Sequence, residues 1–527
     1  RSLVGSEMCI RDRLHTYSEH ILQKYFCLPI FFIEISQKER VWFLAYLCYN
    51  YARKSNTMKQ IHRTGSVIMY KIDFNQPCHI HFIGIGGISM SGLAEILLEE
   101  GFTVSGSDNK ESALTDHLSQ NGATVFYGQK ASNIIDGIDL VVYTAAIHED
   151  NEEFAEAKRQ NLPMLSRAEL LGQLMTNYKT PVAISGTHGK TTTTSMLSHI
   201  ALAADLDPTI SVGGILKAIE GNIRVGGPDL FITEACEYTN SFLSFFPTIG
   251  IILNIDADHL DFFKDIDDIR HSFRKFAELL PAEGALIINA DTPKYEMITE
   301  NLPCKVITYG LEHDAEYTAT DITYDELGHA TFHVLHNGED LGTCSLKVPG
   351  IHNVSNALAS IAAGQLLDLS TEVIFDGLKD FGGTDRRFQY KGKIGDVTII
   401  DDYAHHPTEI EATLHAAKNY PHKKIWCVFQ PHTYTRTKAL LPEFAKALTL
   451  ADHVVLADIY AARETDNLGI SSRNLQEKIV ELGTPCEYFP TFDEIENFLL
   501  ENCTQGDLLI TMGAGDVVNI GEQLLGK

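Results

Sequence analysis

Hydrophobic and polar residues alternate in three successive units along this chain, each with the pattern of an α/β domain. In the first unit an apolar run at 79–85 meets a glycine-rich turn, and apolar residues then recur at helical spacing over 90–97. This alternation predicts a doubly wound parallel sheet that ends near Tyr178. Further strands of this sheet are expected at 103–105, 124–127 and 140–144.

The second unit begins with an apolar run at 181–185, a glycine-hinged loop and a helix-like run at 192–204. Between 317 and 348 the pattern changes to alternating residues around Asn337-Gly338, which predicts a β-hairpin. A parallel sheet with a small antiparallel addition follows from this pattern. Its further strands are expected at 230–233, 249–253 and 285–288, with a helix at 353–367.

Gly382-Gly383 is a candidate hinge before the third unit, whose strands are expected at 397–400, 425–429, 454–457 and 508–511. With 527 residues the chain is too long for one core. We therefore predict an α/β protein of three domains: a Rossmann-like N-terminal domain, a central domain with a parallel sheet and the small antiparallel addition, and a Rossmann-like C-terminal domain. The expected limits are 69–178, 179–382 and 383–527.

The first 68 residues do not match this pattern. Their apolar stretch at 26–51 is interrupted by charged residues, so it lacks the roughly 20 apolar residues that a membrane span needs. No small-residue cleavage site follows a hydrophobic segment, as a signal peptide requires. A clean strand pattern follows Met69 directly. We interpret 1–68 as a non-native or upstream leader and Met69 as the natural start.

Composition narrows the function classes. With 44% hydrophobic and 21% charged residues the chain is an ordinary globular protein, and its net charge of −28 argues against nucleic acid or an anionic membrane as partner. The 10 cysteines contain no C-x-x-C pair, so neither a zinc knuckle nor a redox motif is indicated. We expect reduced cysteines, a cytoplasmic location, no integral membrane insertion, and a monomer or homodimer.

The most informative segment is the loop between the strand at 181–185 and the helix after it. Backbone N–H groups of such a loop, with a helix N-terminus behind them, bind phosphate oxygens. Lys190 would reach the β- and γ-phosphates and Thr191 a Mg²⁺ ion. The loop is a shortened variant, because Ala183 stands where the usual motif has its first glycine. This loop predicts a central parallel sheet of the P-loop ATPase type. The expected nucleotide-binding residues are Gly186, Thr187, His188, Gly189, Lys190, Thr191 and Thr192.

A second glycine-rich turn, at 84–89, resembles a dinucleotide fingerprint but has Ser89 where the last glycine belongs. It is either a diphosphate site at a helix N-terminus or a tight βα turn. Asp108, after the next strand, is placed to reach a ribose hydroxyl. The candidate residues here are Gly84, Gly86, Gly87, Ser89 and Asp108.

Polar residues follow two strands of the central unit. Glu234 and His259 are placed at the carboxyl ends of parallel strands, where they could hold Mg²⁺ against phosphate oxygens. For Glu237, Asp256 and Asp258 we favour a plain role as solvated loop acids.

Two further segments offer ligand contacts or ordinary structural roles. Asn353 and Asn356 could read an adenine edge or cap the helix that they begin. Arg386 and Arg387, at the hinge, could close onto a triphosphate or be ordinary surface arginines.

The third unit places 401–407 and 430–437 after apolar strands, so both crowd one sheet edge. Their polar, aromatic and cationic side chains could hold a small zwitterion, with Arg436 on its carboxylate. About half of them could instead be ordinary loop residues. No role is assigned to the turn at 512–516.

Taken together, these segments resemble the Mur ligase family over residues 69 to about 526. The matching stretches are HIHFIGIGGISMSGLAEIL, SGTHGKTTTTSM, TEACEYTNSFL, NIDADHLD, GIHNVSNALA, DDYAHHPTEI and FQPHTYTRT. The first and the last two stretches are most similar to the family's alanine-adding members.

The resemblance implies an ATP-dependent ligase that joins L-alanine to the lactyl carboxylate of UDP-N-acetylmuramate through an acyl phosphate, with Mg²⁺, in peptidoglycan synthesis. It implies that the turn at 84–87 binds a UDP diphosphate. Lys275 lies near the position of a carbamylated lysine in related ligases, and we assign it no role. The implied ATP contacts are Lys190, Thr191, Asn289, Asn353, Asn356, Arg386 and Arg387, the metal ligands Thr191, Glu234 and His259, and the alanine and muramoyl contacts Tyr403, His405, His432 and Arg436. Lys190, His259, His405 and Arg436 are the expected catalytic residues.

Three alternatives stay open. A recycling ligase would join the same sugar nucleotide to a ready-made tripeptide. An NAD-dependent dehydrogenase would use the turn at 84–87 and leave Lys190 idle. A non-enzymatic nucleotide switch would use ATP without needing a carboxylate and an amine.

Overall fold

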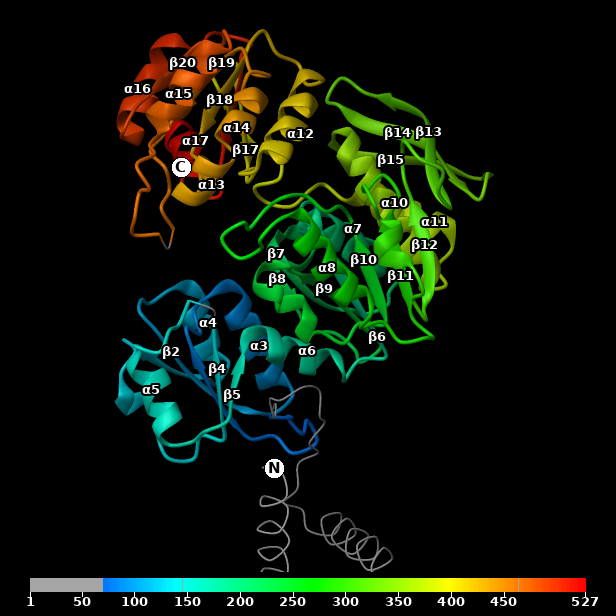
Figure 1. Cartoon of the computed structure of the whole chain (residues 1–527), viewed down its shortest axis with the longest axis vertical. Helices are drawn as coiled ribbons and strands as arrows, with labels where there is room; N and C mark the ends of the chain where they lie inside the picture. The colour runs from blue at the N-terminus through cyan, green and yellow to red at the C-terminus, as the bar shows by residue number, and fades with distance from the viewer. Residues whose placement is uncertain (1–69, 145, 463) are drawn as a thin grey trace, which may run out of the picture. The chain divides into compact units, whose positions relative to one another are not determined.

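The computed structural model describes residues 70–144, 146–462 and 464–527. The expected leader at 1–68 and the expected start at Met69 lie outside the described residues. In the described part the strands form three sheets, of 5, 10 and 6 strands, carried by successive segments of the chain (Figure 1). The α/β fold with three domains is confirmed; the domain limits at 178/179 and 382/383 stay predictions.

The first sheet is fully parallel, with the order β3-β2-β1-β4-β5. The strand order reverses beside β1, and ligands of such sheets bind at the carboxyl ends of the strands at that point. Helix α3 turns the apolar residues of its predicted helical pattern inward, and α5 packs Phe154 against Ile83 and Val141. The elements are β1 (His79–Ile83), α3 (Ile88–Glu99), β2 (Thr103–Asp108), α4 (Ala113–Gln120), β3 (Thr124–Tyr127), η1 (Ala131–Asn133), β4 (Leu140–Tyr143), α5 (Glu152–Arg159), β5 (Met164–Ser166) and α6 (Arg167–Met175).

The central sheet has the order β15-β14-β13-β12-β11-β10-β6-β9-β7-β8. It is parallel from β7 to β13, and β14 and β15 extend it as the predicted antiparallel addition. Its strands are β6 (Thr180–Ser185), β7 (Thr209–Leu216), β8 (Gly221–Arg224), β9 (Leu230–Ala235), β10 (Ile249–Ile252), β11 (Ala285–Asn289), β12 (Lys305–Tyr309), β13 (Tyr317–Tyr324), β14 (His329–His336) and β15 (Glu339–Pro349).

The hairpin between β14 and β15 turns at Asn337-Gly338, as predicted. Both residues have positive φ, 51° and 83°, which is the conformation that a two-residue hairpin turn needs. The antiparallel edge strand β8 is an element that the sequence pattern does not predict.

Three helices, α7 (Lys190–Ala203), α10 (Ile351–Leu366) and α11 (Thr371–Asp380), bury their apolar residues in one core with the central strands. Elsewhere in this segment, α8 (Ile266–Ala277) packs Phe273 and Phe276 on Phe242 of η3 (Tyr238–Ser244). These cores anchor the strands whose carboxyl ends carry the polar loops. The short helices η2 (Lys217–Ile219) and α9 (Glu296–Thr299) complete the segment.

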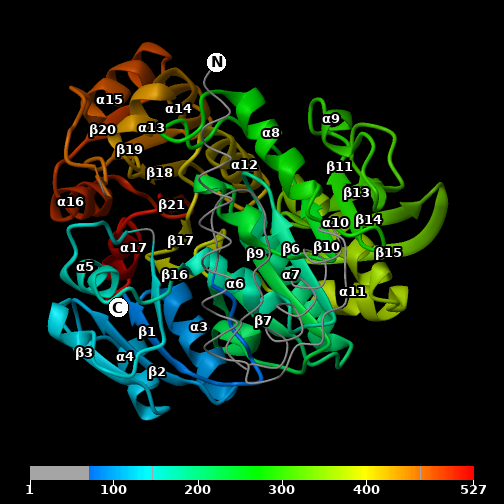
Figure 2. The same cartoon turned by 60° about the horizontal axis from the view of Figure 1, so that its bottom comes forward.

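The third sheet has the order β16-β17-β21-β18-β19-β20 and is parallel except for the edge strand β16, which the sequence pattern does not predict. Figure 2 shows helices on both of its faces: α12, α14 and α15 share one core with it, and α16 and α17 the other. The elements are β16 (Gln389–Ile394), β17 (Val397–Asp402), α12 (Pro407–Lys418), β18 (Ile425–Phe429), α13 (Tyr434–Ala439), α14 (Leu441–Leu448), β19 (His453–Leu456), α15 (Ser472–Glu481), β20 (Cys486–Tyr488), α16 (Phe492–Asn502), β21 (Leu508–Met512) and α17 (Val518–Leu524).

Several strands run further toward their carboxyl ends than hydrophobicity predicts. Asp108 is the last residue of β2, Glu234 lies within β9, and Asp402 ends β17. The ladder continues through these polar residues: Glu234 is in register with Ile184, and Asp402 with Met512. Acidic side chains are therefore held on strands rather than on loops. Among the described helices, none is long and apolar enough to cross a bilayer.

Candidate active site

The loop between β6 and α7 has the backbone of a phosphate-binding turn. Gly186 and Gly189 have φ of 144° and 84°, and a Cβ at Gly189 would lie 2.8 Å from Asn356 Oδ1. Gly189 is also the N-cap of α7 and contributes no side chain to the cap. The first N–H groups of a helix that lacks a capping side chain are donors for an anion. The loop thus has the form that the sequence predicts.

Lys190 is enclosed by acceptors at the start of α7. Its Nζ donates to the carbonyls of Gly186 and Thr187 and forms an ion pair of 3.0 Å with Glu237 Oε2. Burial alone lowers the pKa of this lysine, but Glu237 holds it above its ordinary value. The expectation that Glu237 is a solvated loop acid is wrong: it is 2% exposed because it is the counter-ion of the buried ammonium.

His188 links the phosphate loop to two carboxylates. Its Nε2 lies 3.1 Å from Asp256 Oδ2 and its Nδ1 lies 3.3 Å from Glu409 Oε1. Burial lowers the pKa of this imidazole, but the two carboxylates outweigh burial and raise it to about 9. His188 is therefore a cation at neutral pH. Asp256 is half-exposed but paired, so the expected description of a solvated acid fits it only in part.

The three expected metal ligands, Thr191, Glu234 and His259, line one cavity of about 500 Å³ together with Lys190. Glu234 accepts the Gly213 N–H at 2.6 Å, and burial lowers the pKa of His259, so its ring is neutral. A hydroxyl and a carboxylate suit Mg²⁺, which prefers oxygen ligands. The magnesium assignment stays a prediction. Lys275 lies exposed on α8.

A neighbouring cavity of about 270 Å³ lies beside the phosphate loop. Asn289, Asn356, Thr192 and Arg387 line it, as does His188. The two cavities share His188, Gly189 and Arg387, and together they contain most of the expected nucleotide contacts.

Asn353 occupies a different position. It is buried, donates to the Pro349 carbonyl at 2.7 Å, and accepts from Asn356 Nδ2 at 3.1 Å. Its place behind Asn356 means that it can orient that amide.

Arg386 and Arg387 both lie close to one tyrosine ring. Arg386 and Arg387 have their guanidinium carbons 4.8 Å and 5.2 Å from the centre of the Tyr403 ring. Arg386 also pairs with Asp401 at 3.1 Å and donates to the Gly513 carbonyl at 2.7 Å. Both arginines and Tyr403 line the cavity of the phosphate loop. They form one cluster that lines this cavity.

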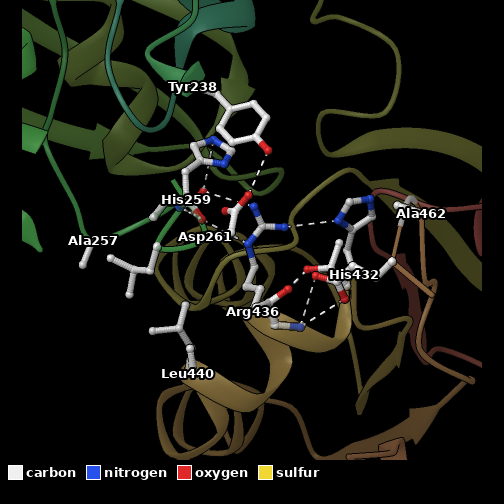
Figure 3. Close-up of a pocket in the computed structure, with 14 residues that line it drawn as sticks. Tyr238, Ala257, His259, Asp261, His432, Arg436, Leu440 and Ala462 are labelled. Atoms are coloured by element: carbon white, nitrogen blue, oxygen red, sulfur yellow. Dashed lines mark hydrogen bonds and ion pairs between the residues drawn. The ribbon is translucent and has the colours of Figure 1, made fainter. Parts of the chain in front are cut away.

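A third cavity, of about 280 Å³, contains Arg436 and His432 from the C-terminal segment together with His259 and Tyr238 from the central segment (Figure 3). An Nη atom of Arg436 lies 3.2 Å from His432 Nδ1. The Tyr238 ring stacks on the His259 ring, with the two ring centroids 4.5 Å apart. His405 lies beside His432, with ring centroids 5.6 Å apart. The expected alanine-site residues are thus brought together.

Asp258 joins this third cavity to the central sheet. It forms an ion pair of 3.1 Å with Arg436 and is 8% exposed. Burial raises the pKa of its carboxyl, but Arg436 holds it well below its ordinary value. The expectation that Asp258 is a solvated acid is wrong, because a guanidinium from the C-terminal segment covers it.

The glycine-rich turn at 84–89 donates a backbone hydrogen bond to the carboxylate at the end of β2. Gly84 has φ 87°, and the Gly86 N–H donates to Asp108 Oδ2 at 2.9 Å. A Cβ at Gly86 would lie 2.8 Å from the same oxygen, so glycine permits this approach. Gly87 caps α3 without a side chain, and Ser89 lies in its first turn. The turn offers helix N–H groups to an anion, with Asp108 beside it.

Glu409 is the residue of the site that sequence reasoning missed. It lies in the first turn of α12 and contacts His188 and His405. The only sequence signal was its place three residues after His406, the spacing of a capping box. That signal predicts a helix start and gives no indication of a contact with a distant loop.

Comparisons with known proteins agree with this architecture. Residues 79–179 match the model of the Mur ligase family, catalytic domain, residues 184–364 match the Mur ligase middle domain, and residues 386–515 match the Mur ligase, glutamate ligase domain. The UDP-N-acetylmuramate–L-alanine ligases of Agathobacter rectalis and Lachnospira eligens are each 63% identical to this chain, covering 87% of it and 100% of the relative.

Two solved structures are also similar. The UDP-N-acetylmuramate–alanine ligase of Thermotoga maritima has a TM-score of 0.72 at 30% identity, covering 85% of this chain and 98% of that one. A murein peptide ligase of Psychrobacter arcticus has a TM-score of 0.64 at 26% identity, with coverage of 85% and 98%. On the strength of these matches, which span all three sheets, the chain belongs to the Mur ligase family.

Proposed function

We infer that this chain is an ATP-dependent ligase that joins L-alanine to the lactyl carboxylate of UDP-N-acetylmuramate in peptidoglycan precursor synthesis. One observation carries the inference: relatives of that name match the chain at 63% identity over their whole length. The cavity that joins a phosphate loop to a cationic cluster supports it.

The chemistry explains why such an enzyme needs a triphosphate. A carboxylate does not accept an amine directly, because its leaving group would be oxide. Attack by a carboxylate oxygen on the γ-phosphorus breaks the bond to the β-phosphate and gives ADP and an acyl phosphate. The neutral amine then attacks the acyl carbon, phosphate leaves, and the nitrogen loses its proton. The protein contributes chiefly position and charge neutralisation.

We assign the polyphosphate to the loop at 186–192. The N–H groups at the start of α7 would hold its oxygens, and Lys190 would leave Glu237 to neutralise the transferred phosphate. Thr191, Glu234 and His259 would hold Mg²⁺, which when bound supplies charge neutralisation at the phosphate oxygens. The rest of ATP would occupy the cavity lined by Asn289, Asn356 and Arg387, with Asn353 holding Asn356 in place.

The alanine site is assigned to the cavity of Figure 3. Arg436 would bind the carboxylate of alanine, sharing its charge with Asp258. His432 and His405 lie beside it, and burial lowers the pKa of His405 to about 4, so its ring is neutral at pH 7 and adds no repulsion toward an ammonium. Tyr403 would hold the arginine pair against the reacting carboxylate.

The UDP diphosphate is assigned to Gly84, Gly86, Gly87 and Ser89 at the N-terminus of α3. Asp108 would bind a ribose hydroxyl; it now accepts the Gly86 N–H, so the sugar nucleotide would have to share this carboxylate with the turn. Location in the cell and oligomeric state stay as predicted above.

The decisive experiment is phosphate release by the pure protein with ATP, UDP-N-acetylmuramate and L-alanine, each omitted in turn. We expect release only with all three present. The similarity to a murein peptide ligase makes the recycling reaction the second candidate. Release with a tripeptide but not with alanine would select that candidate. A dehydrogenase would release no phosphate, and a switch would release it without the acceptor.

A further inference from the structure

One buried carboxylate, Glu409 on α12, lies at the junction of the phosphate loop and the substrate loop. Its Oε1 is 3.3 Å from His188 Nδ1 and 3.9 Å from an Nη atom of Arg387. Its Oε2 accepts the N–H groups of His405 at 3.0 Å and His406 at 3.3 Å. The side chain is 13% exposed. Each carboxylate oxygen thus serves a different part of the site.

Helix capping accounts for only half of these contacts. In a capping box the N3 side chain returns to the N–H of the N-cap residue, and Oε2 does this for His406. The same motif at α6 shows the ordinary case, in which Glu169 accepts the Ser166 N–H at 2.7 Å. The ion pair of Oε1 with the phosphate loop has no role in starting α12.

The charges of this pair favour a strong contact. His188 and the carboxylates around it hold one another ionised: the pKa of His188 is raised to about 9, and cations hold that of Glu409 well below its ordinary value although burial opposes this. Charged hydrogen-bonding pairs that are partly buried contribute more than exposed ones. His188 has Asp256 on its other side, so it is clamped between the central segment and α12.

The pair lies where the two halves of the reaction meet. His188 comes two residues before Lys190, which we assign to the phosphate, and His405, which we assign to the alanine site, lies four residues before Glu409. His188, Lys190, His405 and Glu409 all line the same cavity. A movement of α12 away from the phosphate loop would stretch the contact between His188 and Glu409.

We propose that Glu409 is a positioning residue, which through His188 fixes the loop carrying Tyr403 and His405 against the phosphate loop so that the amine reaches the acyl phosphate. This role rests on the ligase activity inferred above. It predicts that loss of the pair lowers turnover without changing the binding of the sugar nucleotide, whose assigned turn at 84–89 belongs to another sheet.

The test variant is Glu409→Gln, which keeps an oxygen acceptor for the cap and removes the charge from His188. The matched control is Glu411→Gln on the same helix, where the exposed Glu411 lies 3.7 Å from His415 Nε2. We expect kcat to fall about tenfold or more in Glu409→Gln, with the KM for UDP-N-acetylmuramate within about twofold of wild type. The control should match wild type in both. Glu409→Asp, which keeps the charge, should recover part of the loss.

A double-mutant cycle with His188→Gln decides whether the two residues act as a pair. The double variant should be no slower than the slower single variant, because each single change already breaks the contact. The proposal would be overturned if the losses of kcat in the two single variants multiplied in the double variant. It would also be overturned if Glu409→Gln had the kinetics of the control. A melting temperature of Glu409→Gln far below wild type, with no recovery in Glu409→Asp, would reassign the residue to helix capping. Failure of the wild-type protein to use alanine would instead count against the proposed function.

Discussion

The contact between Lys190 and Glu237 gives a quantitative prediction about nucleotide binding. The lysine that we assign to the triphosphate already has a counter-ion 3.0 Å away, on a carboxylate that is 2% exposed. ATP must therefore draw Lys190 from Glu237 and leave the carboxylate behind. Replacing Glu237 with Gln removes the competing charge and keeps the shape of the side chain.

The size of the effect follows from the geometry. Two unit charges 3.0 Å apart attract by about 5.5 kcal/mol at an effective dielectric constant of about 20, before the cost of taking them from water. Because breaking one partner of a buried pair costs about 3–5 kcal/mol, we expect the nucleotide-free Glu237→Gln protein to lose about 3 kcal/mol of unfolding free energy. Bound ATP supplies the missing negative charge. The variant should therefore bind a non-hydrolysable ATP analogue about tenfold tighter or more, since about 1.4 kcal/mol is tenfold.

Two measurements check this reasoning. Denaturant unfolding with and without the analogue gives the stability difference, and calorimetric titration gives the affinity. Glu278→Gln is the control, because Glu278, whose side chain is 51% exposed, pairs with Arg274 of α8, and its loss should change either quantity by less than about 1 kcal/mol. Weaker binding by Glu237→Gln, or an equal loss of stability with and without the analogue, would refute the competition between carboxylate and phosphate.

Four further outcomes are expected. Lys190→Ala should lower turnover about 10²–10³-fold in the phosphate-release assay, and an unchanged rate would remove the loop from the mechanism. Arg436→Ala should chiefly raise the apparent KM for alanine, whereas a change confined to ATP would misplace the amino-acid site. The pKa of His188 is about 9 in the folded protein and about 6.5 in the unfolded chain, so its charge contributes stability that is fully present below pH 6.5 and is lost as the pH rises through 9. The free energy of unfolding should therefore fall by about 3 kcal/mol between pH 6.5 and pH 9. It should fall by less in His188→Gln. Gly189→Ala should abolish binding of the ATP analogue, because φ of 84° and the nearby Asn356 oxygen exclude a methyl group, and unimpaired binding would contradict this reading.

Hydrophobic periodicity and the positions of turn residues were enough to predict the fold class. Apolar runs separated by helical patterns identified most of the central strands of each sheet, and Asn337-Gly338 identified the hairpin, because these signals are local. The edge strands β5, β8, β16 and β20 were missed, since short, half-exposed strands have no distinctive hydrophobic pattern. Two interior strands of the central sheet, β7 and β12, were missed as well.

The candidate site was predictable only where one motif carried the whole chemistry. The phosphate loop could be predicted because its strand, its glycines, its lysine and its helix follow one another in the chain. Glu237 and Asp258 were misread because their burial depends on Lys190 and on Arg436, and the second of these lies 178 positions away. Glu409 was missed for the same reason: a pairing between distant segments leaves no trace in local spacing.

The outermost strand of the ten-stranded sheet has a consequence for how the protein behaves at high concentration. Among the residues that the structure describes, β15 ends the strand order, so one side of its backbone has no neighbouring strand. Its 11 residues make it long for an edge strand. Its first two residues, Glu339 and Asp340, are exposed acids, and the ladder with β14 is broken by irregularities. Charge and irregularity of this kind discourage a second copy from adding its own strand, so neutralising those two acids should make the protein prone to self-association long before it loses its activity.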